Sequence, residues 1–583
     1  MLKIFKNLKK EDWGYLGIGI IFIVLQVWLD LKMPDYMSEI TLLVKTPGSE
    51  MADILTAGGK MLLCALGSLV SAMVVSVIAA RIASNFGATM RGKLFSKVQS
   101  FSMAEIGKFS TASLITRSTN DVTQVQMLIV FGLQAIIKAP IMAVWAIVKI
   151  AGKNTTWTLT TGAAVAVLLV VVIICVSLVM PRFKKIQEYT DDVNRVTREN
   201  LSGLKVVRAY NAEKYQEKKF DVSNQILSST HLFTGRVMAF LMPSIQLVMS
   251  GLTLAIYWLG AAMIDAAELT EKITLFSDMV VFSQYAMQVV MAFMLLVMIF
   301  IILPRASVSA KRILEVLDTE PTIIDGKETE GTETGTIEFR NVSFRYPDAE
   351  EDVLKNISFT AKKGETVAFI GATGCGKSTV INMIPRFYDA TEGEVLVNGR
   401  NVKEYEQKAL RNKIGYVSQK AILFSGTVQS NVAYGDNGKA DKLDSDVVDA
   451  VYTAQASEFV EKMPDGYNGY IAQNGSNLSG GQKQRLSIAR AVCRHPEIMI
   501  FDDSFSALDY KTDRKLREAL HKECKDATKI IVAQRIGTIR DADRIVVLED
   551  GEIAGMGTHD ELMKNCQVYQ QIAYSQLSKE ELA

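Results

Sequence analysis

The sequence is poor in the residues that build metal sites and disulfide frameworks. Its 583 residues include six cysteines and four histidines, and no two cysteines have C-x-x-C spacing. No pair of histidines has the spacing of metal ligands either: His231, His495, His521 and His559. The cysteines therefore indicate reduced intracellular or membrane-buried thiols, and neither a zinc module nor a disulfide-stapled secreted domain is expected.

A strong charge of one sign is also absent. The 64 Lys and Arg residues nearly balance the 63 Asp and Glu residues, so the formal net charge of +1 gives no indication of a nucleic-acid partner. Apolar residues nevertheless make up 49% of the chain, and charged residues make up 22%. A soluble protein rarely combines long apolar runs with that much charge. We therefore expect regions of different character in a chain long enough for two or three domains.

Long apolar runs fill the first 300 residues and do not recur afterwards. Each run is at least ~18 residues long, enough to cross roughly 30 Å of hydrocarbon as a helix. The six runs lie at 14–31, 59–80, 127–150, 157–180, 238–264 and 273–303. An α-helical, six-span transmembrane domain is therefore predicted over residues 1–315. Asp30 and Lys32, at the end of the first run, indicate either a gate or the membrane interface.

Basic residues flank these runs asymmetrically. Lysines precede the first run, Lys and Arg follow the second, fourth and sixth runs, and acidic residues follow the fifth. The positive-inside rule then predicts a multi-pass protein of the cell membrane with both termini in the cytoplasm. The connections at 81–126 and 181–236 are polar and largely helical in pattern. They predict helices that extend well beyond the membrane surface.

The second half begins with an acidic linker, rich in Thr and Gly, predicted over residues 316–335. An apolar strand at 367–370 then runs into Gly371-Ala372-Thr373-Gly374-Cys375-Gly376-Lys377-Ser378-Thr379, and a helical pattern follows. This is a complete phosphate-binding loop between a strand and a helix. Backbone N–H groups surround the phosphates, Lys377 neutralises their charge, and the Ser378 hydroxyl is placed for Mg²⁺. Residues 336–583 are therefore predicted to form an α/β P-loop nucleotide-binding domain.

Two further motifs support this prediction. A second apolar strand, at 498–501, ends in Asp502, and a carboxylate at a strand tip beside the phosphate loop can hold Mg²⁺, usually through water. Between the two strands, Leu478-Ser479-Gly480-Gly481-Gln482 opens a helix. Small residues at a helix N-terminus make a second anion site.

Together these motifs resemble the nucleotide-binding domain of ATP-binding cassette (ABC) transporters, whose signature motif is LSGGQ. The resemblance implies ATP and Mg²⁺ as cofactors. It also implies roles for Gln419, which would sense the γ-phosphate and contact Mg²⁺, for Tyr346, which would stack on adenine, and for Asp509 in the D-loop. The membrane half resembles the exporter type, whose internal loops are long coupling helices. Their tips are expected at Ser113–Arg117 with Asn120-Asp121, and at Val206–Tyr210.

Two positions depart from the family pattern. Asp503 stands where a hydrolysing cassette has Glu, and Gln534 stands where the switch histidine is expected. Asp is one methylene shorter, which sets its carboxylate roughly 1.5 Å back, and catalysis is sensitive to ~1 Å displacements. Gln can donate a hydrogen bond to a phosphate but cannot carry a proton. This chain's own site is therefore predicted to be weakly hydrolytic.

Cassettes of this family work as head-to-tail pairs, with each ATP between one phosphate loop and the other signature. The chain resembles the degenerate-site subunit of bacterial heterodimeric multidrug exporters, which implies a partner half-transporter carrying Glu and His. Amphiphilic compounds are the expected substrates, and Gln284, Tyr285 and Gln288 in the last run are cavity candidates. The alternatives are a lipid or peptide exporter, or an ATP-binding regulatory or gating subunit.

Overall fold

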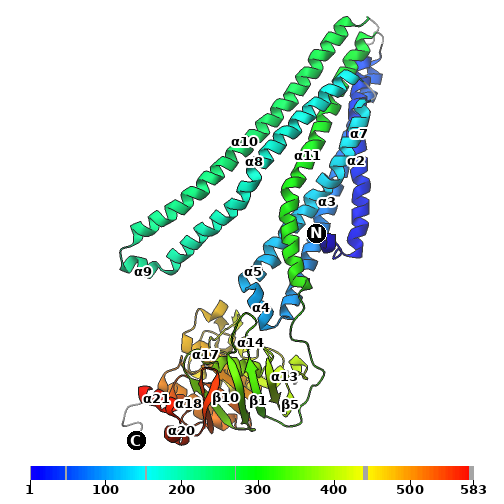
Figure 1. Ribbon diagram of the computed structural model, residues 1–583. Helices are drawn as coiled ribbons and strands as arrows, with labels where there is room; N and C mark the ends of the chain where they lie inside the picture. The colour runs from blue at the N-terminus through cyan, green and yellow to red at the C-terminus, as the bar shows by residue number, and fades with distance from the viewer. Residues whose placement is uncertain (1, 46–48, 152–153, 269–270, 438–443, 577–583) are drawn as a thin grey trace. The chain divides into compact units, whose positions relative to one another are not determined.

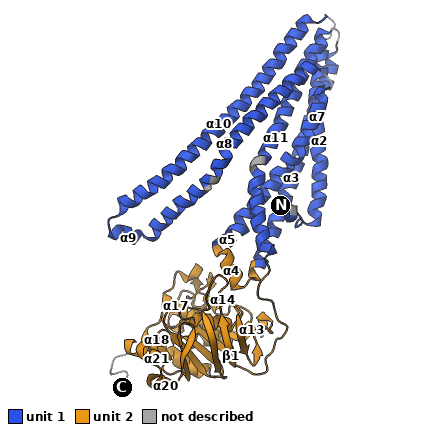
Figure 2. Ribbon diagram, in the orientation of Figure 1, with its two compact units in different colours: residues 1–97, 112–319 blue, residues 98–111, 320–583 orange. Residues whose placement is uncertain are grey.

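The computed structural model describes residues 2–45, 49–151, 154–268, 271–437 and 444–576. The chain forms two compact units, which Figure 2 distinguishes by colour. The first comprises residues 1–97 and 112–319, and the second comprises residues 98–111 and 320–583. The described part of the first unit is helical, whereas the second combines helices with β-sheets.

Six long helical segments of the described chain are apolar enough to cross a membrane (Figure 1). They are α2 (Lys10–Lys45), α3 (Met51–Gln99), the segment Thr111–Ala151, α8 (Thr155–Ser202), α10 (Glu213–Ala266) and α11 (Lys272–Asp318). Each contains one predicted apolar run, so the six-span membrane domain is confirmed. The helices exceed the ~20 residues that a bilayer needs because polar helical stretches continue from their apolar parts.

The third segment changes its helical geometry twice. It consists of α5 (Thr111–Thr116), the π-helical η1 (Arg117–Asp121), α6 (Val122–Gly132), the π-helical η2 (Leu133–Lys138) and α7 (Ala139–Ala151). Pro140 follows η2 almost directly, and a proline ring crowds the carbonyl group of the preceding turn. The wider π-turn gives that ring room.

The long connections turn at α4 (Met103–Phe109) and at α9 (Leu204–Ala209). The expected tip at Val206–Tyr210 is confirmed, because it overlaps α9, which lies between the paired helices α8 and α10 (Figure 1). The expected first tip at Ser113–Arg117 with Asn120-Asp121 is wrong, because those residues lie inside α5 and η1. The chain turns earlier, where Ser102 and Glu105 form a capping box that starts α4.

The second unit is built on a mixed sheet with the strand order β12-β11-β3-β10-β9-β6. The strands are β3 (Thr366–Gly371), β6 (Ile414–Val417), β9 (Ile498–Asp502), β10 (Thr528–Val532), β11 (Arg544–Glu549) and β12 (Glu552–Gly557). All neighbours are parallel except β11 and β12. The parallel strands therefore end at one edge, and this confirms the predicted α/β class.

A smaller antiparallel sheet has the order β2-β1-β4-β5. Its strands are β1 (Ile337–Phe344), β2 (Leu354–Ala361), β4 (Glu392–Val397) and β5 (Arg400–Asn401). Helix α12 (Lys377–Met383) packs between this sheet and the larger one, since its Val380 and Ile381 are buried among side chains of β1 and β3. The start of α12 is thereby fixed beside the ends of the parallel strands.

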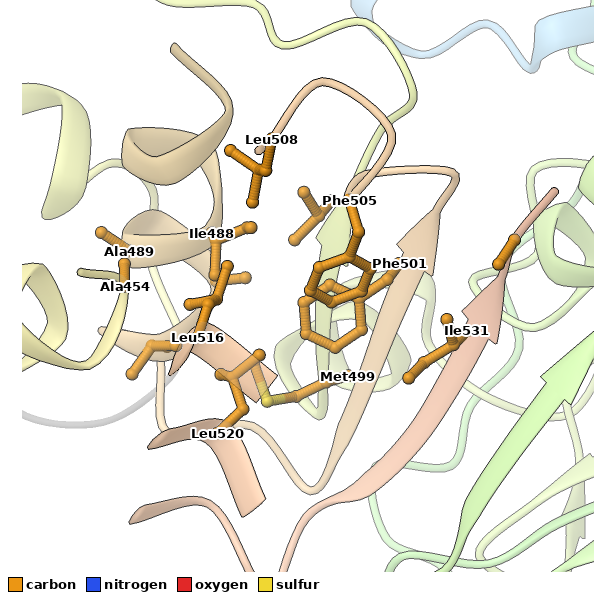
Figure 3. Close-up of a cluster of buried hydrophobic side chains, with 14 of the residues drawn as sticks. Ala454, Ile488, Ala489, Met499, Phe501, Phe505, Leu508, Leu516, Leu520 and Ile531 are labelled. Carbon is orange, nitrogen blue, oxygen red and sulfur yellow. The ribbon is translucent and has the colours of Figure 1, made fainter. Parts of the chain in front are cut away.

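Helices α17 (Gly480–Val492) and α18 (Tyr510–Glu523) pack against β9 through the larger core. Figure 3 shows Leu516 and Leu520 of α18 beside Met499 of β9, with Phe505 next to Phe501. The two phenylalanine ring centroids are 5.2 Å apart. This core holds the end of β9 and the start of α17 in place, and both belong to predicted functional motifs.

Candidate nucleotide-binding site

The phosphate loop joins the end of β3 to the start of α12 and depends on its glycines. Gly374 and Gly376 have φ angles of 90° and 96°, in the left-handed region that favours glycine. A Cβ atom added to Gly376 would lie 2.6 Å from Cδ2 of Leu354, and one added to Gly371 would lie 2.1 Å from the carbonyl oxygen of Leu548. The backbone of the loop therefore has no room for side chains at these two positions.

The Lys377 ammonium lies within this loop. It donates hydrogen bonds to the carbonyl oxygens of Gly371 at 2.9 Å and Ala372 at 2.7 Å, and it lies 3.5 Å from the sulfur of the buried Cys375. The loop thus combines a positive charge with the N-terminus of α12, where Ser378 and Thr379 occupy the first turn. Such an arrangement attracts phosphate groups. Thr373 completes the predicted set and lies in the same loop.

Ser378 and Asp502 meet at the end of the sheet. The Ser378 hydroxyl donates to Oδ1 of Asp502 at 2.8 Å, so one small cation can contact both oxygens. Burial raises the pKa of the Asp502 carboxyl, and neighbouring Asp503 adds to this effect, while the hydrogen bond from Ser378 opposes it. A bound cation would favour the ionised carboxylate. A hydroxyl, a carboxylate and phosphate oxygens form the hard ligand set that Mg²⁺ prefers, so these residues fit that ion.

Asp503 lies between two glutamines. Its Oδ2 accepts hydrogen bonds from Nε2 of Gln534 at 2.9 Å and from Nε2 of Gln419 at 3.3 Å. Its backbone has a φ of 45°, and its N–H donates to the carbonyl oxygen of Val532 at 3.0 Å. Burial raises the pKa of the Asp503 carboxyl, against the lowering effect of the Gln419 hydrogen bond. The two positions that depart from the family pattern therefore touch each other.

Gln419 was predicted to contact the metal, and its amide lies with Asp503 instead of with the Ser378–Asp502 pair. No local sequence pattern links Gln419 to Asp503, which follows it by 84 residues. The contact arises because the parallel neighbours β6 and β9 end side by side, so the loops that follow them meet. A displacement of the Asp503 carboxylate would therefore break or shift its hydrogen bond with the Gln419 amide.

The signature motif forms the start of α17. The Ser479 hydroxyl accepts the Gln482 N–H at 3.3 Å, and the Gln482 side chain accepts the Ser479 N–H at 2.8 Å, which makes a capping box. A Cβ added to Gly480 meets no described atom within 4 Å, and one added to Gly481 makes only ordinary contacts. Among the described residues, nothing in the chain itself therefore requires glycine at these positions.

Asp509 and Tyr346 have contacts of their own. Asp509 caps α18 by accepting the Thr512 N–H at 3.0 Å. The hydroxyl of Tyr346 shares a hydrogen bond with the Thr379 hydroxyl at 3.1 Å, and its ring packs edge-on against Tyr388, with centroids 5.3 Å apart. Tyr388 was missed in the sequence, where its only signal is an aromatic residue after α12. The pair places an aromatic surface beside the first turn of that helix.

Comparisons with known proteins match both halves of the chain. The family described as "ABC transporter transmembrane region" matches residues 16–313, and the family described as "ABC transporter" matches residues 354–506. An uncharacterized ABC transporter ATP-binding protein of Mycobacterium tuberculosis is 38% identical over 530 residues, which cover 90% of this chain and 88% of the relative.

Two more comparisons extend this similarity. The ATP-dependent lipid A-core flippase of Pseudomonas fluorescens is 33% identical over 475 residues, covering 81% of this chain and 78% of the flippase. The solved structure of a bacterial Atm1-family ABC exporter with ATP bound shares the fold, with a TM-score of 0.80. It is 22% identical and covers 98% of this chain and 100% of that structure.

Proposed function

Because this chain belongs to the ABC transporter family of ATP-driven exporters, we propose that it is the degenerate-site subunit of a heterodimeric exporter. In this proposal residues 1–315 form the membrane domain, 316–335 the linker and 336–583 the cassette, with both termini in the cytoplasm. The proposal rests on the 2.9 Å hydrogen bond from the Gln534 amide to the Asp503 carboxylate. A hydrolytic site of this family has His and Glu at these two positions.

This pair is poorly suited to activate water. The Asp503 carboxylate ends roughly 1.5 Å short of a glutamate carboxylate, and catalysis responds to displacements of ~1 Å. Two amides already donate to one of its oxygens, so that oxygen is engaged by side chains and is not free to accept a proton from an attacking water. Neither amide can carry a proton or a positive charge. The site would therefore hold ATP longer than it takes a competent site to hydrolyse it.

Nucleotide binding itself is supported at this site. Ser378 and Asp502 would hold Mg²⁺, which when bound neutralises charge on the β- and γ-phosphates. Lys377 and the N–H groups of the loop would hold the phosphates, and Tyr346 with Tyr388 would contact the base. Binding without fast turnover suits a site that keeps two cassettes together.

The signature side supports a competent partner site. Gly480 and Gly481 lie at an open helix N-terminus, where the described chain leaves space for side chains. Their requirement for glycine is explained if the phosphate of an ATP bound to the partner approaches this backbone closely. The partner would then supply Glu and His at its own hydrolytic positions.

The substrates proposed are amphiphilic compounds taken from the cytoplasm or the inner leaflet. Of the three cavity candidates, Gln284, Tyr285 and Gln288, the last two hydrogen-bond to α2 within the membrane half. Export of a lipid is the second candidate, and it is favoured by the similarity to a lipid A-core flippase.

The experiment compares Gly481→Asp with Lys377→Ala in the purified heterodimer at saturating ATP. Gly481→Asp places an acidic side chain against the partner's γ-phosphate, so ATPase activity and transport should nearly vanish. Lys377→Ala weakens binding only at the slow site and should leave a substantial fraction of both activities. Gly481→Ala controls for size without charge and should fall between them. If Lys377→Ala is the more damaging change, the two sites have been assigned the wrong way round.

A further inference from the structure

Charged residues belong to the membrane-crossing helical segments of the first unit. Asp30 and Asp35 are on α2, Lys138 ends η2, and Lys149 is on α7. Charges within membrane segments are costly, and they commonly mark a binding site or a transport pathway. The nucleotide site uses none of them.

The two ion pairs that these residues form are unequal. Lys149 Nζ lies 2.8 Å from Oδ2 of Asp35, whose other oxygen accepts the Tyr285 hydroxyl. Lys138 Nζ lies 3.5 Å from Oδ2 of Asp30, and within the described residues it donates no hydrogen bond. The Lys138 side chain is only 14% exposed. An ammonium group carries three N–H donors, so Lys138 is left short of acceptors.

Unsatisfied acceptors lie around the same aspartate. Gln26, one helical turn before Asp30, is 7% exposed, and its side-chain oxygen has no partner among the described residues. The Gln288 amide donates at 3.1 Å to the carbonyl oxygen of Asp30. This oxygen lacks its usual helical donor, because Pro34, four residues later, has no backbone N–H. The side-chain oxygen of Gln288 is likewise buried without a described partner. Buried polar groups without partners are costly in a membrane, so a bound group is expected to complete them.

An apolar groove begins two residues after Lys138. It has a volume of about 460 Å³ and is lined by Pro140, Ile141, Val144, Trp145 and Val148 of α7. An alkyl chain fits such a surface, and its charged end would then lie near Lys138. The charged cluster and the groove together have the two-part character of an amphiphile.

We propose that Gln26, Asp30, Lys138 and Gln288 bind the zwitterionic head of an amphiphile. Its anionic group contacts Lys138, its ammonium group contacts the amide oxygens of Gln26 and Gln288, and its alkyl chain lies along the α7 groove. An anionic head would leave the amide oxygens without donors, and a cationic head would supply none of the acceptors that Lys138 lacks. This inference rests on the proposed export function only in naming the class of substrate.

The test measures binding to the full chain in a non-ionic detergent without nucleotide. The probes share one alkyl chain and carry a phosphoethanolamine, a phosphate or a trimethylammonium head. The phosphoethanolamine probe should bind at least about tenfold more tightly than the phosphate probe or the trimethylammonium probe, as expected for one more charge-assisted contact. Lys138→Met should remove this preference, Lys138→Arg should retain it, and Gln26→Leu should reduce it.

Lys149→Met is the matched control, because it removes a lysine from the same helical segment. Unlike Lys138, Lys149 already makes a short ion pair, at 2.8 Å to Asp35. The control variant should leave the preference unchanged. Equal binding of the three heads, or equal effects of Lys138→Met and Lys149→Met, would overturn the proposal and leave water as the partner of these groups. If phosphatidylethanolamine alone competes for the site, the ligand is a two-chain membrane lipid. If the single-chain probe competes as well, the head group is what the site recognises. Since no nucleotide is present, failure here is separate from failure of the ATPase comparison.

Discussion

Replacing Asp503 by Glu and Gln534 by His together should make this chain's phosphate-loop site hydrolytic. The backbone of Asp503 is fixed by its left-handed conformation and by its hydrogen bond to Val532. The added methylene should therefore move the carboxylate outward by roughly 1.5 Å instead of shifting the strand end. Histidine at 534 takes the place of an amide that already contacts this carboxylate at 2.9 Å, so the two new side chains should still meet.

The expected gain follows from what a positioned base contributes, typically ~10²–10⁴-fold. We expect the double variant to hydrolyse ATP about 10²-fold faster at this site, at the lower end of that range, because Gln419 still competes for the carboxylate. Asp503→Glu alone should gain less, since the Gln534 amide cannot carry charge. Gln534→His alone should gain little, because the carboxylate remains too short. The two effects should be non-additive, as expected for residues in contact.

The assay uses the heterodimer with the partner's hydrolytic glutamate replaced by glutamine, so that only this site turns over. Single-turnover hydrolysis of labelled ATP measures the rate, and Lys377→Ala in the double variant should return it to background. A double variant no faster than its parent would refute the reasoning from carboxylate position. So would a parent chain that already hydrolyses ATP briskly.

Two further predictions concern other contacts of the second unit. Tyr346→Phe loses only the hydrogen bond to Thr379 and should leave the affinity for a fluorescent ATP analogue nearly unchanged, whereas Tyr346→Ala should weaken it roughly tenfold. Burial alone would raise the pKa of Glu105, but hydrogen bonds from Ser102 and Thr322 outweigh it and hold the pKa below the ordinary 4.5. The resulting stabilisation is present above pH 4.5 and is lost as the pH falls through the lowered pKa. Glu105→Ala, but not Glu105→Gln, should speed amide exchange at Thr322 roughly two- to tenfold.

The parts of the fold that could be predicted depend on local patterns. Each membrane helix carries its own apolar run, and the phosphate loop lies in one continuous strand–loop–helix segment. The first loop tip was misplaced although a local signal was present. Ser102 and Glu105 have the spacing of a capping box, and this signature marks a helix start ahead of the predicted tip.

The parts that could not be predicted depend on contacts between distant residues. Asp503 and Gln534 each stood out in the sequence, but their contact exists because β9 and β10 are parallel neighbours that end together. The partnership of Tyr346 and Tyr388 likewise depends on how the small sheet packs on α12. Residue identity indicated the chemistry of the site, and the sheet order decided which groups touch.

The unequal ion pairs of the membrane half show why their pairing requires the structure. Lys138 and Lys149 are eleven residues apart, or ~16 Å along a helix, whereas Asp30 and Asp35 are five residues apart, or ~7.5 Å. These two spacings differ by about 9 Å, so the two ion pairs are not expected to have equal geometry. The structure gives the short contact to Lys149 and the long one to Lys138. A hydropathy window conceals this, because an 18-residue window of the segment Thr111–Ala151 still has a mean hydropathy of 2.0. The longer pair is the one beside the unsatisfied glutamines, and this coincidence makes Asp30 and Lys138 the better candidates for contact with a transported molecule.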